Sequence, residues 1–286
     1  MKTNLQLVSF LTSDHLSLPG LLYEPEKKTD RVAIYLHGNG SSSIFYGAEE
    51  MNLFGEILNK NGISFFPFNN RGAHWFKKLN AGANDTKSRV LYGMAVELIK
   101  ECIIDIDSAI NYLKKIGYKT FYLIGVSTGA NKIVVYHYYR KNNPVGKYVL
   151  LSGGDDTGLY FEYNFKKNKK YFFQFLEKCR NVIKNGNGKK LVPRSLVSDP
   201  LISYQSLYDT VNPNGDYNIF PFNEYMNKLH LSKKPLFKEY RTIDKPTLKE
   251  CPNRKLFTFK IIKGADHGFT GKEKELLKII TDWLRD

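Results

Sequence analysis

Five residues in the middle of the chain have the types and spacing of a nucleophilic serine site. Gly125, Ser127 and Gly129 fit the pattern G-x-S-x-G. The residues before them, TFYLI, predict a buried strand, and the residues after them, ANKIVVYHYY, predict a helix. Two glycines let such a strand and helix approach closely, so the serine side chain points outward from a strained turn. We therefore expect Ser127 to be a nucleophile for acyl carbon; the alternative is a glycine-rich turn with a bystander serine.

A serine nucleophile needs a base to take its proton, and His267 is the best placed of the six histidines. It lies in KGADHGF, after a strand predicted over 256–262 and before a predicted C-terminal helix. His74, in the loop RGAHW, is the alternative base, because that loop also follows a predicted strand. His15 and His230 lie in peripheral segments, and His137 lies in the middle of a predicted helix.

The intermediate of acyl transfer carries a negative oxygen, which needs N–H donors. The stretch HGNG at 37–40 follows a strand predicted over 31–36. We expect its backbone to supply one donor, the N–H of Asn39, and the N–H of Thr128 to supply the other. A loop that only joins strand to helix is the alternative. Nucleotide binding is not favoured, because the stretch lacks the lysine of a phosphate-binding loop and the spacing GxGxxG.

Taken together, these motifs resemble those of serine hydrolases of the α/β-hydrolase superfamily, across nearly the full chain. HGNG, NNRGAH, GVSTG and GADHGF occur in the family's order, each at the end of a predicted strand. Serine before histidine is also the family's chain order. The resemblance implies a serine hydrolase that cleaves a carboxylic ester or a related small acyl compound, without a metal or other cofactor. Thioesterases, amidases, peptidases and non-catalytic proteins share this fold, so the motifs predict the fold more strongly than the reaction.

The resemblance also implies a carboxylate that orients His267, in a loop after the seventh strand of the family's sheet. Pro246–Leu248 begins such a strand, but KECPN follows at once, so we expect the segment that carries the acid to be missing. An amide in place of this acid can reduce the rate by orders of magnitude. The other carboxylates that could serve are Asp155, Asp156, Asp244 and Glu250.

Asp266, next to His267, is expected to point away from the imidazole ring. The absence of any effective acid is a further possibility. The alternative function is therefore a catalytically impaired protein of the hydrolase fold that binds an acidic or aromatic ligand without turnover.

Predicted strands and helices alternate along the chain in the order and at the spacing typical of an α/β protein with a doubly wound, mostly parallel sheet. The predicted strands are 4–10 and 16–23 in a leading hairpin, then 31–36, 63–68, a strand ending before Ser127, a strand and loop over 147–156, and 256–262. Helices are predicted before Asn61-Gly62, over 90–116, over about 129–140 and at the C-terminus. Residues 157–241 interrupt this pattern and are basic and aromatic. We expect them to form an inserted helical cap over a core made of 1–156 and 242–286.

Composition narrows the other possibilities. The 286 residues are 42% hydrophobic, but no stretch is apolar for long enough to span a membrane, and the N-terminus lacks the apolar block of a signal peptide. We therefore expect a cytoplasmic protein. The net charge of +15 comes mostly from lysines scattered along the chain, so no nucleic-acid partner is expected. The three cysteines are far apart and favour reduced thiols over disulfides or a metal site. Nothing in the sequence indicates the oligomeric state.

Overall fold

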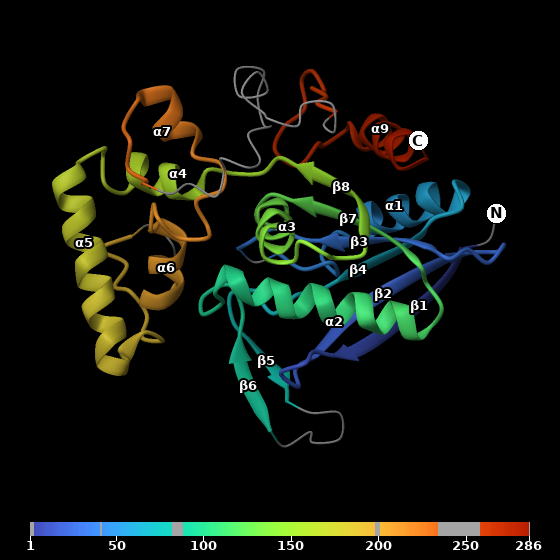
Figure 1. Ribbon diagram of the computed structural model, residues 1–286, viewed down its shortest axis with the longest axis horizontal. Coiled ribbons are helices and arrows are strands. Elements are labelled where there is room, and N and C mark those ends of the chain that lie inside the picture. Colours follow the sequence, from blue (N-terminus) through green and yellow to red (C-terminus); the bar gives the residue numbers. More distant parts are fainter. Residues whose placement is uncertain (1–2, 41, 82–87, 198–200, 234–257, 286) are drawn as a thin grey trace.

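A six-stranded sheet forms the centre of the molecule in the computed structural model, which describes residues 3–40, 42–81, 88–197, 201–233 and 258–285 (Figure 1). The strand order is β1-β2-β4-β3-β7-β8. β3 pairs in parallel with β4 and β7, and β7 with β8, while β1–β2 and β2–β4 are antiparallel. The strands are β1 Thr3–Leu11, β2 Ser17–Pro25, β3 Arg31–Leu36, β4 Ser64–Phe68, β7 Thr120–Val126 and β8 Val145–Leu151.

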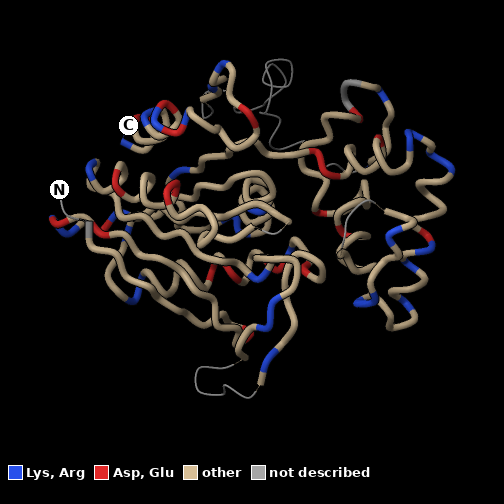
Figure 2. Tube along the Cα trace, turned by 180° about the vertical axis from the view of Figure 1, so that it is seen from behind, with Lys and Arg blue, Asp and Glu red and all other residues tan. Residues whose placement is uncertain are grey.

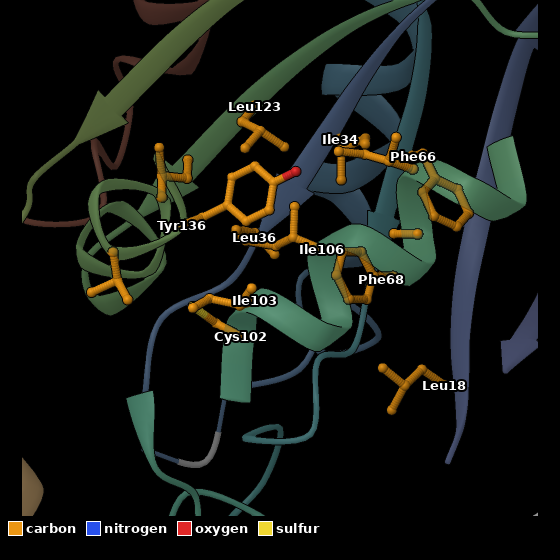
Figure 3. Packing of buried hydrophobic residues seen from close by; sticks show 14 of the residues in the cluster. Leu18, Ile34, Leu36, Phe66, Phe68, Cys102, Ile103, Ile106, Leu123 and Tyr136 are labelled. Atoms are coloured by element: carbon orange, nitrogen blue, oxygen red, sulfur yellow. The ribbon is translucent and has the colours of Figure 1, made fainter. Parts of the chain in front are cut away.

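Helices cover both faces of this sheet, because the central strands are apolar on both sides. The helices α2 (Cys102–Lys115) and α3 (Thr128–Tyr139) pack on the face that carries Ile34, Leu36 and Phe66 (Figure 3). The helices α1 (Ala48–Lys60) and α9 (Glu273–Arg285) pack on the opposite face, against alternate residues of the same strands. The predicted α/β fold with a mostly parallel sheet is confirmed.

The last helix, α9, is tied to two strands by cationic side chains at its C-terminal end. Arg31 of β3 donates from Nη2 to the carbonyl oxygen of Leu284 at 2.9 Å, and Lys147 of β8 donates from Nζ to that of Trp283 at 2.7 Å. Positive charges favour this end of a helix, where the carbonyl groups have no partners within the helix. These contacts fix α9 over the second hydrophobic face.

Helices from the predicted insert lie beyond the carboxyl ends of β7 and β8 (Figure 1). They are α4 Asp156–Tyr163, α5 Lys169–Val182 with the following turn η2 Ile183–Asn187, α6 Tyr204–Val211 and α7 Phe222–Asn227. Most of their apolar side chains form a hydrophobic cluster of their own. The segment 217–220 differs, because Tyr217, Ile219 and Phe220 join the core beneath α2 and α3.

Most of the predicted elements are confirmed. The leading hairpin, the strands at 31–36 and 63–68, the strand before Ser127, and the helices before Asn61, after Ser127 and at the C-terminus are present within a few residues of their expected bounds.

The long helix predicted over 90–116 is wrong in its first part. Residues Arg89–Tyr92 form a strand, β6, which pairs with β5 (Lys77–Asn80) in a separate two-stranded hairpin. A short 3-10 turn, η1 (Ile99–Glu101), follows, and α2 begins only at Cys102. Gly93 has a φ of 121°, a left-handed value that ends the strand and that a helix does not permit.

The predicted last strand is not confirmed. Residues 258–262 are described and have no strand structure, while the rest of 256–262 and the short strand at 246–248 lie outside the described residues. Within the described part of the chain, no helix is long and apolar enough to cross a membrane.

Candidate active site

Ser127 lies in a strained turn between β7 and α3. Its φ of 54° and ψ of −125° are rare for a residue with a side chain. Close packing surrounds the turn: a Cβ atom added to Gly125 would lie 2.4 Å from the carbonyl oxygen of Gly129, and one added to Gly129 would lie 2.2 Å from that of Leu36. The Ser127 N–H donates to the carbonyl of Leu151 in β8 at 2.9 Å. Strand, helix and neighbouring strand thus hold the serine in this conformation.

The loop after β3 lies directly against Ser127. β3 and β7 are parallel neighbours, with Leu36 opposite Gly125, so their carboxyl ends meet at one edge of the sheet. A Cβ atom added to Gly38 would lie 3.0 Å from the Cβ of Ser127 and 3.5 Å from its Oγ. The backbone of HGNG therefore passes beside the hydroxyl, where a glycine leaves room.

Asn39, Thr128 and Tyr217 meet beside this loop. The Asn39 side chain donates from Nδ2 to the Tyr217 hydroxyl at 2.6 Å, and the same hydroxyl lies close to the side chain of Thr128. Thr128 is the first residue of α3, and the first N–H groups of a helix have no partner within it. Burial, followed by the charge of Asp156, raises the pKa of Tyr217, so its hydroxyl stays protonated.

Two further basic side chains lie under the loop. His37 is buried, and its Nδ1 is 2.7 Å from the carbonyl oxygen of Gly38. Burial, helped by the positive charge of Lys132, lowers the pKa of His37 to about 3, so the ring is neutral. Lys132 of α3 is fully buried and donates to Glu97 at 2.6 Å and to Asn70 at 3.0 Å. These two contacts join α3 to the segment between β6 and η1 and to the loop after β4.

Asp155, a candidate for the acid, accepts a backbone N–H group with each of its two carboxylate oxygens. Its Oδ1 accepts the N–H of Gly158 at 2.8 Å and its Oδ2 accepts the N–H of Asn223 at 2.7 Å. Asp155 thus caps α4 and ties it to the start of α7. Burial raises the pKa of Asp155 to about 6 in spite of these two donors.

The other candidate acids lie in different surroundings. Asp156 is half-buried at the start of α4, and a Cβ atom added to Gly154 would lie 3.3 Å from its Oδ1. Asp266 accepts the N–H groups of Gly268 and Thr270, so it closes its own loop, in keeping with the expectation that it turns away from the ring. Asp244 and Glu250 lie outside the described residues.

Neither candidate base contacts Ser127 in the part of the chain that the structure describes. His267 is exposed, and no hydrogen bond joins its ring to Ser127 or to a carboxylate there. The Nδ1 of His74 is 2.6 Å from the Tyr46 hydroxyl. Burial, followed by the charge of Lys77, lowers the pKa of His74. The described residues include no group of three or more His, Cys, Asp or Glu side chains placed to hold a metal ion.

The structure thus brings Ser127, Gly38, Asn39 and Thr128 together, and leaves His267 apart from them. Tyr217 and the pair Lys132–Glu97 are additions that the motifs did not indicate. A lysine within the apolar run of α3 was a visible signal for a buried ion pair, because a charge in a fully buried helix needs a partner. The sequence around Tyr217, GDYNIFPF, carries no such signal.

Comparison with known proteins places esterases and other hydrolases among the similar solved structures. No protein-family model and no curated protein matches the sequence. The Pyrococcus furiosus esterase Pf2001 is 21% identical, over 62% of this chain and 64% of that one, with a TM-score of 0.41. A thermostable carboxyl esterase from Bacillus coagulans is 13% identical, over 68% and 55%, with a TM-score of 0.45.

Est1E from Butyrivibrio proteoclasticus, solved with ferulic acid, is 15% identical, over 54% of this chain and 56% of that one, with a TM-score of 0.40. In each of these alignments this chain covers less than two thirds of the other protein. The α/β fold itself follows from the strand order and helix placement described above.

Proposed function

We propose that this chain is a serine hydrolase that cleaves a carboxylic ester or a related small acyl compound. The observation that carries the proposal is the strained Ser127 turn with the backbone of Gly38 packed against it. This arrangement presents a hydroxyl at the edge of the sheet, next to two segments with backbone N–H groups. A nucleophile beside preorganised donors is the minimum that acyl transfer needs.

The proposed reaction has two steps. Ser127 Oγ attacks the ester carbonyl carbon while His267 takes its proton, and the N–H groups of Asn39 and Thr128 hold the negative oxygen. The alcohol then leaves with the proton from His267, and the acyl group stays on Ser127. Water, deprotonated by the same histidine, attacks the acyl-serine and releases the acid. We also propose that residues 157–241 form the cap that bounds the substrate.

His267 has to reach Ser127 when substrate binds for this scheme to operate. Catalytic hydrogen bonds are often long or absent in substrate-free enzymes and form only in the complex. His267 is exposed in the loop that precedes α9, and among the described residues no hydrogen bond or ion pair of its side chain would have to break first.

Labelling with a fluorophosphonate tests the proposal, since this reagent reacts with activated serines. We expect the wild type and Ser9→Ala, an exposed serine far from the site, to label equally, and Ser127→Ala to lose labelling. Labelling of Ser127→Ala at the wild-type rate would refute the proposal. His267→Ala should reduce the rate at least ~100-fold, as expected for a general base, while His74→Ala should leave it within a few-fold. The reverse result would assign the base to His74.

A hydrolase-fold protein that binds its ligand without turnover is the second candidate. Two observations favour it: both oxygens of Asp155 are held by backbone N–H groups, and the described residues provide no carboxylate in contact with His267. Such a protein would retain an aromatic or acidic ester unchanged after gel filtration. Hydrolysis of that ester that depends on Ser127 would exclude this candidate.

A further inference from the structure

We infer that Tyr217 is a positioning residue that holds the two oxyanion donors at their working separation. The inference rests on the proposed function, and it concerns a residue from the inserted region, 178 positions away from Asn39 in the chain. One phenol hydroxyl touches the side chains of both residues whose backbone N–H groups are the proposed donors.

The two donors come from different elements. Asn39 belongs to the loop after β3, and Thr128 begins α3. Within the described part of the chain, the Asn39 amide has one hydrogen bond: its Nδ2 donates to Tyr217 at 2.6 Å, while its Oδ1 is buried without a partner. The loop is steadied once more by Ser42, whose hydroxyl donates to the Asn39 carbonyl at 2.6 Å. Among the described residues, the Tyr217 hydroxyl therefore binds the loop through Asn39 and lies next to the start of α3.

Tyr217 can act as a fixed reference because its own surroundings are rigid. Its ring is 5% exposed, and Asn218, Ile219 and Phe220 after it are also buried. Phe220 packs so closely on the backbone after β8 that a Cβ atom on Gly153 would lie 2.5 Å from its ring. Asp216, just before it, accepts the Tyr139 hydroxyl at 2.5 Å. This segment is part of the core of the sheet rather than of the separate helical cluster.

The chemistry follows from this geometry. An oxyanion is stabilised by donors that already point at it, because reorienting them during the reaction costs free energy. Without the Tyr217 hydroxyl, the Asn39 amide and the Thr128 hydroxyl lose a shared partner and the loop can move relative to α3. The expected loss is in the transition state, where the donors bear charge, and not in ground-state binding.

Tyr217→Phe tests the inference, because it removes the hydroxyl and keeps the ring in the core. With p-nitrophenyl acetate as substrate, we expect kcat to fall about tenfold and KM to stay within about twofold. The rate of fluorophosphonate labelling at Ser127 should fall by a similar factor. Tyr118→Phe is the matched control: this buried hydroxyl bonds Glu24 and Ser64 beside the opposite end of β7, and its loss should leave both rates within about twofold.

A double-mutant cycle separates positioning from general loosening. Asn39→Ala keeps the backbone N–H and removes the amide that contacts Tyr217. If the two side chains act as one unit, Asn39→Ala and Tyr217→Phe should each lower kcat by a similar factor, and the double variant should be no slower than the slower single one. Multiplying effects would overturn the inference, as would an unchanged kcat in Tyr217→Phe. If Tyr217→Phe does not fold, Thr128→Val replaces it in the cycle, since it removes the other partner of the same hydroxyl.

Failure of the proposed function gives a different result. In that case the wild type itself shows no labelling that depends on Ser127, and the role of Tyr217 falls with it. A wild type that labels at Ser127 together with an unaffected Tyr217→Phe would refute only the present inference.

Discussion

Replacement of Gly129 by alanine tests whether the packing of β3 against α3 sets the geometry of the Ser127 site. The added Cβ atom would lie 2.2 Å from the carbonyl oxygen of Leu36 and 2.9 Å from that of His37. Ordinary contacts begin at 3.4 Å, so the helix and the strand end must separate by about 1 Å. Leu36 and His37 lead directly into the loop of Gly38 and Asn39. The displacement therefore separates the loop from Ser127.

The size of the effect can be estimated from this displacement. Overpacking of this kind costs about 1–3 kcal/mol of folding free energy, which a domain of this size tolerates. A misplacement of about 1 Å can lower a catalysed rate ~100-fold. We therefore expect Gly129→Ala to remain folded, to unfold at a lower urea concentration, and to label with fluorophosphonate at about one hundredth of the wild-type rate.

Gly146→Ala is the control for the Gly129→Ala variant. Gly146→Ala in β8 has room for its methyl group, since the nearest atom, the carbonyl oxygen of Phe121, would be 3.9 Å away. It should match the wild type in both urea unfolding and labelling. If folded Gly129→Ala labels Ser127 at the wild-type rate, the close approach of strand and helix does not control the geometry of the Ser127 site.

Three further predictions concern the charges around the site. Glu97→Ala should destabilise the fold by about 3–5 kcal/mol in urea unfolding, because it leaves the Lys132 ammonium buried without its partner, whereas a double change to apolar residues should recover most of this. Burial raises the pKa of Asp209 to about 7, so folding favours the protonated acid, and the contribution of this group to stability should be full below about pH 4 and be lost as the pH rises through 7. Asp209→Asn keeps an acceptor for the Ile99 N–H and should flatten this part of the profile of Tm against pH. Asp155→Ala should cost about 1–2 kcal/mol of stability with little change in kcat, as a helix cap would; a large fall in kcat at unchanged stability would identify it as the acid.

Local patterns were enough to predict the elements that form the sheet. The apolar runs at 31–36 and 63–68 predict strands buried on both faces, and both are β-strands with almost fully buried side chains. The turn at Ser127 could also be predicted, because two glycines at a strand–helix junction indicate that the strand and the helix approach each other closely. These features depend on residues that are close together in the sequence.

Other features depend on contacts that the sequence does not display. Leu91 and Met94 continue the helical spacing of α2 and so predicted a helix, but Leu91 is 48% exposed and belongs to the hairpin β5–β6. Apolar residues that continue a helical spacing by chance cannot be distinguished, from the spacing alone, from the buried face of a longer helix. The hydroxyl of Tyr217 reaches Asn39 only because the segment 217–220 packs into the core of the sheet. No spacing rule connects residues so far apart.

The attachment of α9 has a consequence for how the protein is made. Leu276, Leu277, Ile280 and Leu284 complete the hydrophobic cluster on one face of the sheet, against strands that leave the ribosome much earlier. Chains emerge at about 5–20 residues per second and fold from the N-terminal side. Until α9 has emerged, this face of the nascent sheet has no cover from it, and Arg31 and Lys147 lack the carbonyl groups that they hold in the finished fold. We therefore expect a chain stalled before residue 273 to leave this face of the sheet uncovered by α9 and prone to aggregation.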